Sequence, residues 1–229
     1  MRAMILAAGR GERMRPLTDT CPKPLLEVGG KPLIVWHLEK LAAAGIREVV
    51  INHAWLGQLI EQRLGDGSAW GMRISYSPET TALETAGGIA HALPLLGDAP
   101  FLVINGDIFT DYDFAQLVAV AQRMQQAPQQ LGHLVLMPKA SYPTGRDLAM
   151  DADGYAKASE AGDEPMTYAG LAVYTPAFLR DVPANQPSPL LPHFLRGMAQ
   201  RQLTAERFTG QWLDVGTTER LAAANQLVA

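Results

Sequence analysis

Short apolar runs alternate with amphipathic stretches over the first half of the chain. Apolar-rich runs at residues 3–8, 47–52, 72–77 and 100–105 predict buried strands. Helical spacing of apolar residues predicts helices between Pro32 and Gly45, over residues 55–64 and over residues 85–96. Strands that alternate with helices imply right-handed crossovers, so this half predicts a mostly parallel sheet covered on both faces.

The regular alternation of predicted strands and helices ends after about residue 130. Residues 134–137, 148–150, 166–174 and 203–208 predict strands with irregular connections, and residues 187–200 and 217–228 predict helices. This pattern predicts an antiparallel or mixed extension of the first sheet within the α/β class. No low-complexity linker, repeat or break in composition interrupts the chain, so we expect one domain over residues 1–229.

Composition narrows the class of protein. Hydrophobic residues make up 48% of the 229 residues and charged residues 18%, which is typical of a packed globular protein. The single cysteine, Cys21, has no disulfide partner within the chain, which fits a reducing cytoplasm. No apolar run approaches the roughly 20 residues of a membrane span, and the apolar start is too short for a signal peptide. We therefore expect a cytoplasmic protein with no membrane partner.

Charge is distributed unevenly along the chain. The net charge of −4 argues against a nucleic-acid partner. Residues 1–31 nevertheless hold six basic and three acidic side chains, a net charge of +3, so the remaining residues carry −7. A basic opening on an acidic protein predicts a local site for an anion.

A glycine loop follows the first predicted strand, with the sequence GRGER over residues 9–13. Glycines let backbone N–H groups approach phosphate oxygens, and the two arginines add charged donors. An ordinary tight turn is the alternative interpretation. Met14 stands where a dinucleotide-binding loop has its third glycine, and no Gly-Lys-Ser/Thr triplet occurs, so a nicotinamide-dependent oxidoreductase and a Walker-type site are disfavoured.

Lys23 lies between two prolines a dozen residues after the glycine loop. Pro22 and Pro24 restrict the backbone, so the lysine becomes a positioned point charge that can meet a phosphate. A solvated loop lysine is the alternative interpretation.

Four sequence blocks together resemble the signature of the sugar-1-phosphate nucleotidyltransferases. These blocks are GRGERMRPLT with PKPL at residues 9–25, ETAGG at 84–88, NGD at 105–107 and WLDVGT at 212–217. The resemblance implies a Rossmann-like, three-layer α/β/α fold (GT-A-like) with a mostly parallel mixed sheet and a small sugar-side β extension. It also implies that about residues 1–130 bind the nucleotide and about residues 131–229 bind the sugar.

The reaction of this family joins a sugar-1-phosphate to the α-phosphate of a nucleoside triphosphate and releases pyrophosphate. The attacking phosphate is already a nucleophile near neutral pH, so catalysis reduces to positioning two anions and stabilising charge. The resemblance implies catalytic roles for Lys23 at the reacting phosphates, Arg13 at the triphosphate tail, and Asp107. It also implies that Asp107 and Asp214 hold Mg²⁺, which prefers hard oxygen ligands.

The resemblance assigns further residues to the two substrates. The expected nucleotide-binding residues are Ala7, Ala8, Gly9, Gly11, Arg13, Lys23, Glu79, Gly87 and Gly88. The expected sugar-binding residues are Asn105, Asp147, Glu160 and Gly170. The Glu-Lys-Pro run of many relatives is absent, because residues 157–161 read KASEA.

Within the family, residues 51–57, 96–101 and 111–114 are most similar to the N-acetylmuramate α-1-phosphate uridylyltransferases of peptidoglycan recycling. This similarity implies UTP and N-acetylmuramate α-1-phosphate as substrates and UDP-MurNAc as product. A mannose-1-phosphate guanylyltransferase and a glucose-1-phosphate uridylyl- or thymidylyltransferase stay open, as does a catalytically silent, nucleotide-sensing subunit. From the length we expect no β-helix acyltransferase domain of the kind that bifunctional relatives carry, and the sequence does not fix the oligomeric state.

Overall fold

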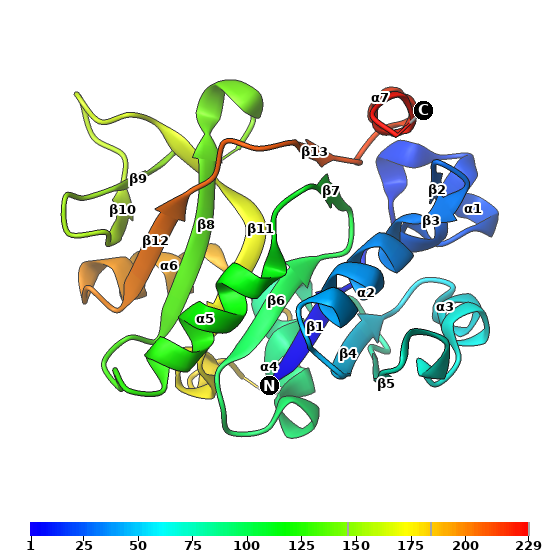
Figure 1. Ribbon diagram of the computed structural model, residues 1–229, viewed down its shortest axis with the longest axis horizontal. Helices are drawn as coiled ribbons and strands as arrows, with labels where there is room; N and C mark the ends of the chain where they lie inside the picture. Colours follow the sequence, from blue (N-terminus) through cyan, green and yellow to red (C-terminus); the bar gives the residue numbers. More distant parts are fainter. Residues whose placement is uncertain (146, 184, 229) are drawn as a thin grey trace.

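Nine strands form one mixed sheet in the computed structural model, which describes residues 1–145, 147–183 and 185–228 (Figure 1). The strand order is β10 (Ala156–Ala158), β9 (Leu148–Met150), β11 (Met166–Tyr174), β6 (Phe101–Asn105), β1 (Arg2–Leu6), β4 (Glu48–His53) and β5 (Arg73–Pro78). Strand β8 (Gly132–Pro138) also lies beside β11, and β12 (Leu203–Arg207) lies beside β8. Strands β6, β1, β4 and β5 are parallel, whereas β11 is antiparallel to β6, β8 and β9.

Helices cover both faces of the sheet. One face carries α2 (Leu33–Ala43), α3 (Gly57–Leu64) and α5 (Phe114–Met124), and the other carries α4 (Glu84–Leu96) and α6 (Leu191–Ala199). Because side chains alternate along a strand, Ile5 of β1 joins the core with Leu38 of α2, whereas Met4 joins the core with Ile89 of α4. The predicted three-layer α/β fold with a mostly parallel mixed sheet is confirmed.

Several predicted elements differ from the observed ones at their ends. The first strand ends at Leu6, because the Ala7 amide leaves the ladder and donates a hydrogen bond to Asn52 Oδ1 at 2.9 Å. The helix predicted over residues 187–200 begins only at Leu191. Helix α5 was not predicted, although Asp113 caps it by accepting a hydrogen bond from the Ala115 amide.

Short elements connect these layers. They are η1 (Glu12–Met14), α1 (Leu17–Thr20), η2 (Lys23–Leu25), β2 (Glu27–Val28), β3 (Lys31–Pro32), η3 (Ser68–Trp70), β7 (Ile108–Thr110), η4 (Lys139–Ser141), η5 (Pro176–Leu179), β13 (Trp212–Asp214) and α7 (Thr218–Gln226). Strands β7 and β13 form a small antiparallel sheet of their own, as do β2 and β3. Within the described ranges, no helix combines the length and apolar character that crossing a membrane requires.

A small third core joins the two ends of the chain. Met14 after the glycine loop, Phe109 of β7, Val215 after β13 and Ala224 of α7 are buried together in it. Figure 1 shows the resulting arrangement, with α7 near the C-terminus beside β2 and β3. The position of Met14 also explains why a third glycine is missing there, since its side chain is fully buried in this core.

We predict that Met14→Ala lowers the free energy of unfolding by about 2–5 kcal/mol, because it opens a cavity in the third core. Leu17→Ala is the matched control, since Leu17 lies in the same segment but is 42% exposed, and we expect a change of only about 0.5 kcal/mol. Urea unfolding followed by circular dichroism measures both. Equal losses in the two variants would contradict the role given to this core.

Candidate active site

The turn that carries Asp107 lies directly against the end of the first strand. Leu6 of β1 and Asn105 of β6 are neighbours in the parallel ladder, and the Gly106 amide donates to the Leu6 carbonyl oxygen at 2.9 Å. A Cβ at Gly106 would lie 2.6 Å from that same oxygen, so only glycine permits this approach. The Asn-Gly-Asp turn is thereby held beside the glycine loop at the carboxyl edge of the sheet, where ligands of open α/β sheets bind.

Lys23 reaches this turn from the proline-flanked segment. Its Nζ atom lies 2.6 Å from Asp107 Oδ2, and the lysine is only 8% exposed. The glycine loop packs on the same lysine, because a Cβ at Gly11 would lie 3.4 Å from Lys23 Cβ. Gly11 has a φ of +71°, a left-handed conformation that favours glycine. The two parts of the signature motif therefore form one structural unit.

Asp214 is brought next to Asp107 by the pairing of β13 with β7. Asp214 lies opposite Ile108 in this ladder, and the Val215 amide donates to the Asp107 carbonyl oxygen at 2.8 Å. The buried Asp214 side chain accepts two hydrogen bonds at Oδ2, one from the Tyr142 hydroxyl and one from Arg220 Nη1, each at 2.7 Å. The backbones of the two aspartates are thus joined although they lie far apart in the sequence.

Arg13 reaches the same region from the glycine loop. A Cβ at Gly216 would lie 2.9 Å from Arg13 Nη2 and also 2.9 Å from Asp214 Oδ1. The absence of a side chain at Gly216 therefore lets the guanidinium of Arg13 and the carboxylate of Asp214 both approach this position.

Two adjoining cavities lie at this edge. The first, of about 150 Å³, is lined by Ala7, Lys23, Pro24, Gly106, Asn105 and Asp107 together with Leu6, Gly9 and Thr85. The second, of about 170 Å³, is lined by Ala8, Asn52, Glu79, Ala82 and Glu84 together with the same Leu6, Gly9 and Thr85. The lysine and Asp107 face the first cavity, whereas Glu79 faces the second.

Glu79 stands at the end of a buried hydrogen-bond chain. Its Oε1 accepts from Asn52 Nδ2 at 2.6 Å and its Oε2 accepts from the Leu83 amide at 2.9 Å. Asn52 in turn accepts from the Ala7 amide, so that amide is not free for a ligand. Gly88 gives the carboxylate room, because a Cβ there would lie 2.6 Å from Glu79 Oε1. Glu79 therefore braces the cavity wall in addition to facing it.

Gly87 has a different neighbour. A Cβ at Gly87 would lie 2.5 Å from the Gln186 carbonyl oxygen, and its amide donates to the Ser188 carbonyl oxygen. This glycine lets the segment before α6 pack against the start of α4, and it does not line either cavity.

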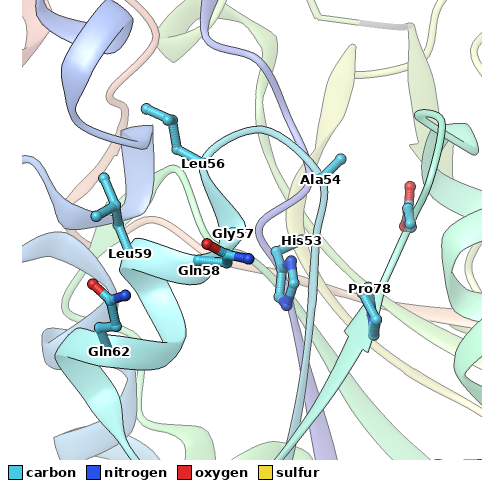
Figure 2. A pocket seen from close by; sticks show the side chains of 9 residues that line it. His53, Ala54, Leu56, Gly57, Gln58, Leu59, Gln62 and Pro78 are labelled. Carbon is cyan, nitrogen blue, oxygen red and sulfur yellow. The ribbon is translucent and has the colours of Figure 1, made fainter.

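A larger cavity, of about 450 Å³, adjoins the second one through Glu79. Figure 2 shows Gln58, Leu59 and Gln62 of α3 on one side, across from His53 and Pro78 at the ends of β4 and β5. The three cavities therefore adjoin one another along the carboxyl edge of the sheet, from Lys23 past Glu79 to α3.

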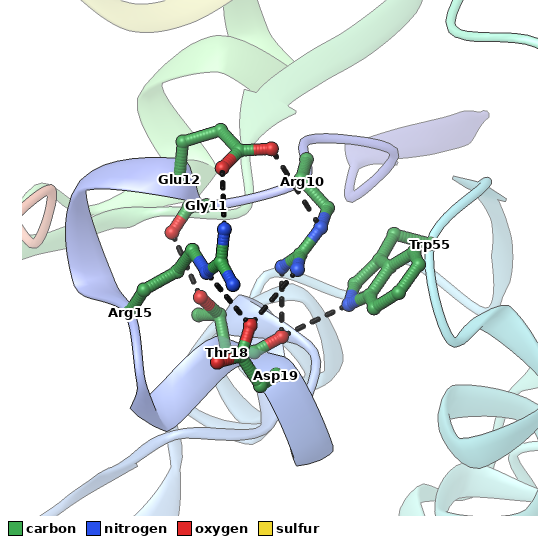
Figure 3. A network of polar contacts seen from close by, with 7 residues as sticks. All are labelled: Arg10, Gly11, Glu12, Arg15, Thr18, Asp19 and Trp55. Atoms are coloured by element: carbon green, nitrogen blue, oxygen red, sulfur yellow. Dashed lines mark hydrogen bonds and ion pairs between the residues drawn. The ribbon is translucent and has the colours of Figure 1, made fainter.

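A network of polar contacts braces the glycine loop (Figure 3). Arg10 donates to the Thr18 carbonyl oxygen and to Asp19 Oδ1, and its guanidinium lies 3.8 Å from the centroid of the Trp55 ring. Trp55 Nε1 donates to the same Thr18 carbonyl oxygen at 2.9 Å. The hydrogen bond from Arg10 holds the pKa of the Asp19 carboxyl below its usual value. The sequence predicted that Arg10 supplies a charged donor to a phosphate, whereas in the structure its guanidinium is engaged within the protein.

The expected sugar-binding residues divide into two groups. Gly170, with a φ of +75°, lies against Asn105, since a Cβ there would be 2.8 Å from Asn105 Nδ2. Asp147 is exposed and forms an ion pair with Lys139. Glu160 is exposed in the turn after β10, where its amide donates to Asp163 Oδ2. Only Asn105 and Gly170 are brought together with the cavity that Lys23 lines.

The two aspartates fit the chemistry of a magnesium site. Both supply hard carboxylate oxygens, and their backbones are adjacent. In the parts of the chain that the structure describes, no third histidine, cysteine or acidic residue joins them. The rest of a coordination sphere would therefore come from substrate phosphates and water, as is usual for Mg²⁺.

Several residues of this site were not predicted from the sequence. Thr85 lines two cavities. It lies within the ETAGG block at residues 84–88, so that block could have identified it from the sequence. Tyr142 and Arg220 contact Asp214 from segments without a recognised role, and nothing in the sequence alone pointed to them.

The family model for nucleotidyl transferases matches residues 2–142, a range that contains the glycine loop, Lys23 and Asp107. The chain therefore belongs to the nucleotidyl transferase family. Its match to known members extends over nearly its whole length, as the following relatives show.

The chain is 50% identical over 229 residues to the N-acetylmuramate alpha-1-phosphate uridylyltransferase of Neisseria meningitidis serogroup B, covering 99% of this chain and 98% of the relative. It is 36% identical over 236 residues to the enzyme of the same name from Caulobacter vibrioides, covering 99% and 96%. A Bacillus anthracis structure named as a glucose-1-phosphate thymidylyltransferase has a TM-score of 0.81 at 21% identity, covering 100% of this chain and 95% of that one. That structure has the same fold.

We predict that Glu79→Gln lowers the free energy of unfolding by about 1–3 kcal/mol. Glutamine has one acceptor oxygen, whereas two donors, Asn52 Nδ2 and the Leu83 amide, face the carboxylate. Asn52 cannot invert its amide to compensate, because its oxygen accepts from Ala7. Urea unfolding measures the loss.

The matched control is Glu61→Gln. Glu61 pairs with His53 Nε2 at 2.7 Å, and His53 lines the large cavity that Glu79 also lines. A glutamine oxygen at position 61 can still accept that hydrogen bond. We expect a change within about 0.5 kcal/mol. If Glu79→Gln were as stable as this control, the hydrogen-bond chain would not brace the site.

Proposed function

We propose that this protein transfers a uridylyl group from UTP to N-acetylmuramate α-1-phosphate, giving UDP-MurNAc and pyrophosphate in peptidoglycan recycling. The identity of 50% to the Neisseria meningitidis enzyme over nearly both whole chains carries this proposal. The convergence of Lys23, Arg13, Asp107 and Asp214 at one edge of the sheet supports it. The reaction takes place in the cytoplasm, where both substrates are soluble anions.

In the proposed reaction, an oxygen of the sugar phosphate attacks the α-phosphorus of UTP. A new phosphorus–oxygen bond forms as the bond to the β-phosphate breaks, and pyrophosphate leaves. No general base is needed, because the attacking phosphate is already ionised. The protein contributes by holding the two anions in line and by offsetting negative charge at the α-phosphate.

The cations of the site have distinct tasks in this proposal. Lys23 is held in position by its two neighbouring prolines. When the substrates bind, its ammonium leaves Asp107 and contacts the reacting phosphates. Arg13 binds the triphosphate tail beside Gly216. Mg²⁺, held by Asp107 and Asp214, supplies positive charge that neutralises the phosphates when it is bound.

The cavities suggest how the substrates divide the site. The nucleotide extends across the two adjoining cavities, from Ala7 and Gly9 in the first to Ala8 and Glu79 in the second. Gly11 packs beside Lys23, and Gly87 and Gly88 allow α4 to pack closely behind the second cavity. The sugar lies at the part of the first cavity that Asn105 lines, where Gly170 contacts Asn105. Asp147 and Glu160 follow farther out at the sugar end. About residues 1–130 thus serve the nucleotide and about residues 131–229 the sugar, within one domain.

We predict that, with Mg²⁺, the protein releases pyrophosphate fastest with UTP and N-acetylmuramate α-1-phosphate. A coupled phosphate assay with inorganic pyrophosphatase compares this pair with GTP and mannose-1-phosphate, and with UTP or dTTP and glucose-1-phosphate. Faster turnover of either competing pair would replace the proposed substrates. Release with no pair from folded protein would instead favour a nucleotide-sensing subunit.

We predict that Asp107→Asn lowers turnover by about 100-fold or more, because it removes a charged metal ligand that stabilises the transition state. The side chain of Asp107 is 39% exposed, so its replacement should leave the fold intact. Asp98→Asn is the control, since Asp98 is an exposed carboxylate in the turn after α4. Steady-state kinetics over a range of Mg²⁺ concentrations measures both. Near-normal Mg²⁺-dependent turnover of Asp107→Asn would refute the metal assignment.

A further inference from the structure

Arg220 contacts the carboxylate of Asp214, although no motif gives it a role. It projects from the first turn of α7, whose cap residue Thr217 accepts a hydrogen bond from the Arg220 amide. Its Nη1 atom lies 2.7 Å from Asp214 Oδ2, and the side chain is about one-third exposed while that of Asp214 is 11% exposed. A cation from the C-terminal helix therefore neutralises a buried carboxylate of the site.

The guanidinium is also held by an aromatic ring. Its Cζ atom lies 5.1 Å from the centroid of the Tyr142 ring, within the range of a cation–π contact. The Tyr142 hydroxyl donates to the same Oδ2 that Arg220 contacts. Tyr142 is in turn held edge-on to Trp212, whose Nε1 donates to the Ala169 carbonyl oxygen. The ion pair is thus supported by residues from three separate segments of the chain and is not a loose surface contact.

The two aspartates are paired in the same way. Lys23 Nζ lies 2.6 Å from Asp107 Oδ2, as Arg220 Nη1 lies 2.7 Å from Asp214 Oδ2. A divalent cation that approaches these carboxylates meets a like charge beside each of them. A nucleoside triphosphate that arrives with the metal brings negative charge. Its phosphates can attract Lys23 and Arg220 away from the two carboxylates.

We propose that Arg220 is a resident counter-cation of Asp214 that keeps divalent metal from binding tightly until the nucleotide arrives. The inference rests on the proposed magnesium site. Arg220 is a positioning residue in this account, because it acts through Asp214. It occupies the carboxylate in the resting enzyme, holds Oδ2 in place together with Tyr142, and gives way whenever a metal ion binds, either at a high concentration of metal alone or at a lower one together with the nucleotide.

The test measures Mn²⁺ binding to the whole protein in the absence of nucleotide and sugar, with free Mn²⁺ followed by electron paramagnetic resonance. Arg220→Gln removes the charge and keeps a polar side chain of related shape. Its Kd for Mn²⁺ should fall about tenfold below that of the wild type, since Asp214 loses its competing cation. A merely structural role predicts the opposite direction, because a disordered carboxylate binds metal more weakly.

Two control variants separate the charge from other effects. Arg220→Lys keeps the positive charge, and its Kd for Mn²⁺ should stay within about twofold of the wild type. Arg207→Gln removes an arginine that pairs with Glu164 on the surface, and it should leave metal binding unchanged. An Arg220→Gln protein that binds Mn²⁺ as weakly as the wild type, or more weakly, or not at all, would overturn the proposal.

A second measurement uses the wild-type protein, so it does not depend on the folding of Arg220→Gln. The side-chain Nε–Hε resonance of Arg220 is assigned by its absence from the spectrum of Arg220→Lys. Saturating Mg²⁺ should shift this resonance, because the guanidinium leaves Asp214, and an unchanged resonance would contradict the exchange. Neither measurement contains UTP or N-acetylmuramate α-1-phosphate, so failure of the proposed substrates would not affect these outcomes.

Discussion

The site depends on the backbone contact between β7 and β13, which brings together residues from distant parts of the chain. Asp107 follows a central strand, whereas Asp214 lies near the C-terminus, and the Val215 amide joins them at the Asp107 carbonyl oxygen. Burial of Phe109 and Val215 in the third core, together with Met14, stabilises this contact. The same core therefore fixes the glycine loop and both carboxylates relative to one another. Met14, Phe109 and Val215 therefore contribute both to the stability of the fold and to the geometry of the site.

Charge pairing is the second constraint on the site. Each carboxylate already has a cation, Lys23 for Asp107 and Arg220 for Asp214. The buried Asp214 carboxylate and the buried Lys23 ammonium would be costly without partners, so the resting protein pairs both of them internally. A divalent metal can then take the place of the two cations at the carboxylates. Phosphates can take the place of the carboxylates at Lys23 and Arg220. Substrate binding in this account is an exchange of ionic partners at a site whose backbone is already in place.

The sequence predicted the three-layer fold well, because buried strands and amphipathic helices alternate clearly in its first half. The motifs also predicted that Lys23 and Asp107 belong to one site, since signature blocks mark them directly. Tyr142 and Arg220 could not be predicted, because their contact with Asp214 arises from tertiary packing between segments without a motif. Glu79 was expected at the nucleotide, yet its hydrogen bonds within the protein depend on how β4, β5 and α4 pack. Helix α5 was missed although its cap and its apolar stripe were present in the sequence.

A crystal of the protein grown with Mn²⁺ and a non-hydrolysable UTP analogue would show directly whether Asp107 and Asp214 hold the metal and whether the nucleotide displaces their resident cations. Anomalous scattering locates the manganese without reference to activity. We expect a metal ion bound by the carboxylates of both Asp107 and Asp214, with Lys23 turned from Asp107 to a phosphate oxygen. A metal ion bound elsewhere, or a Lys23–Asp107 pair that persists beside the bound nucleotide, would contradict this expectation.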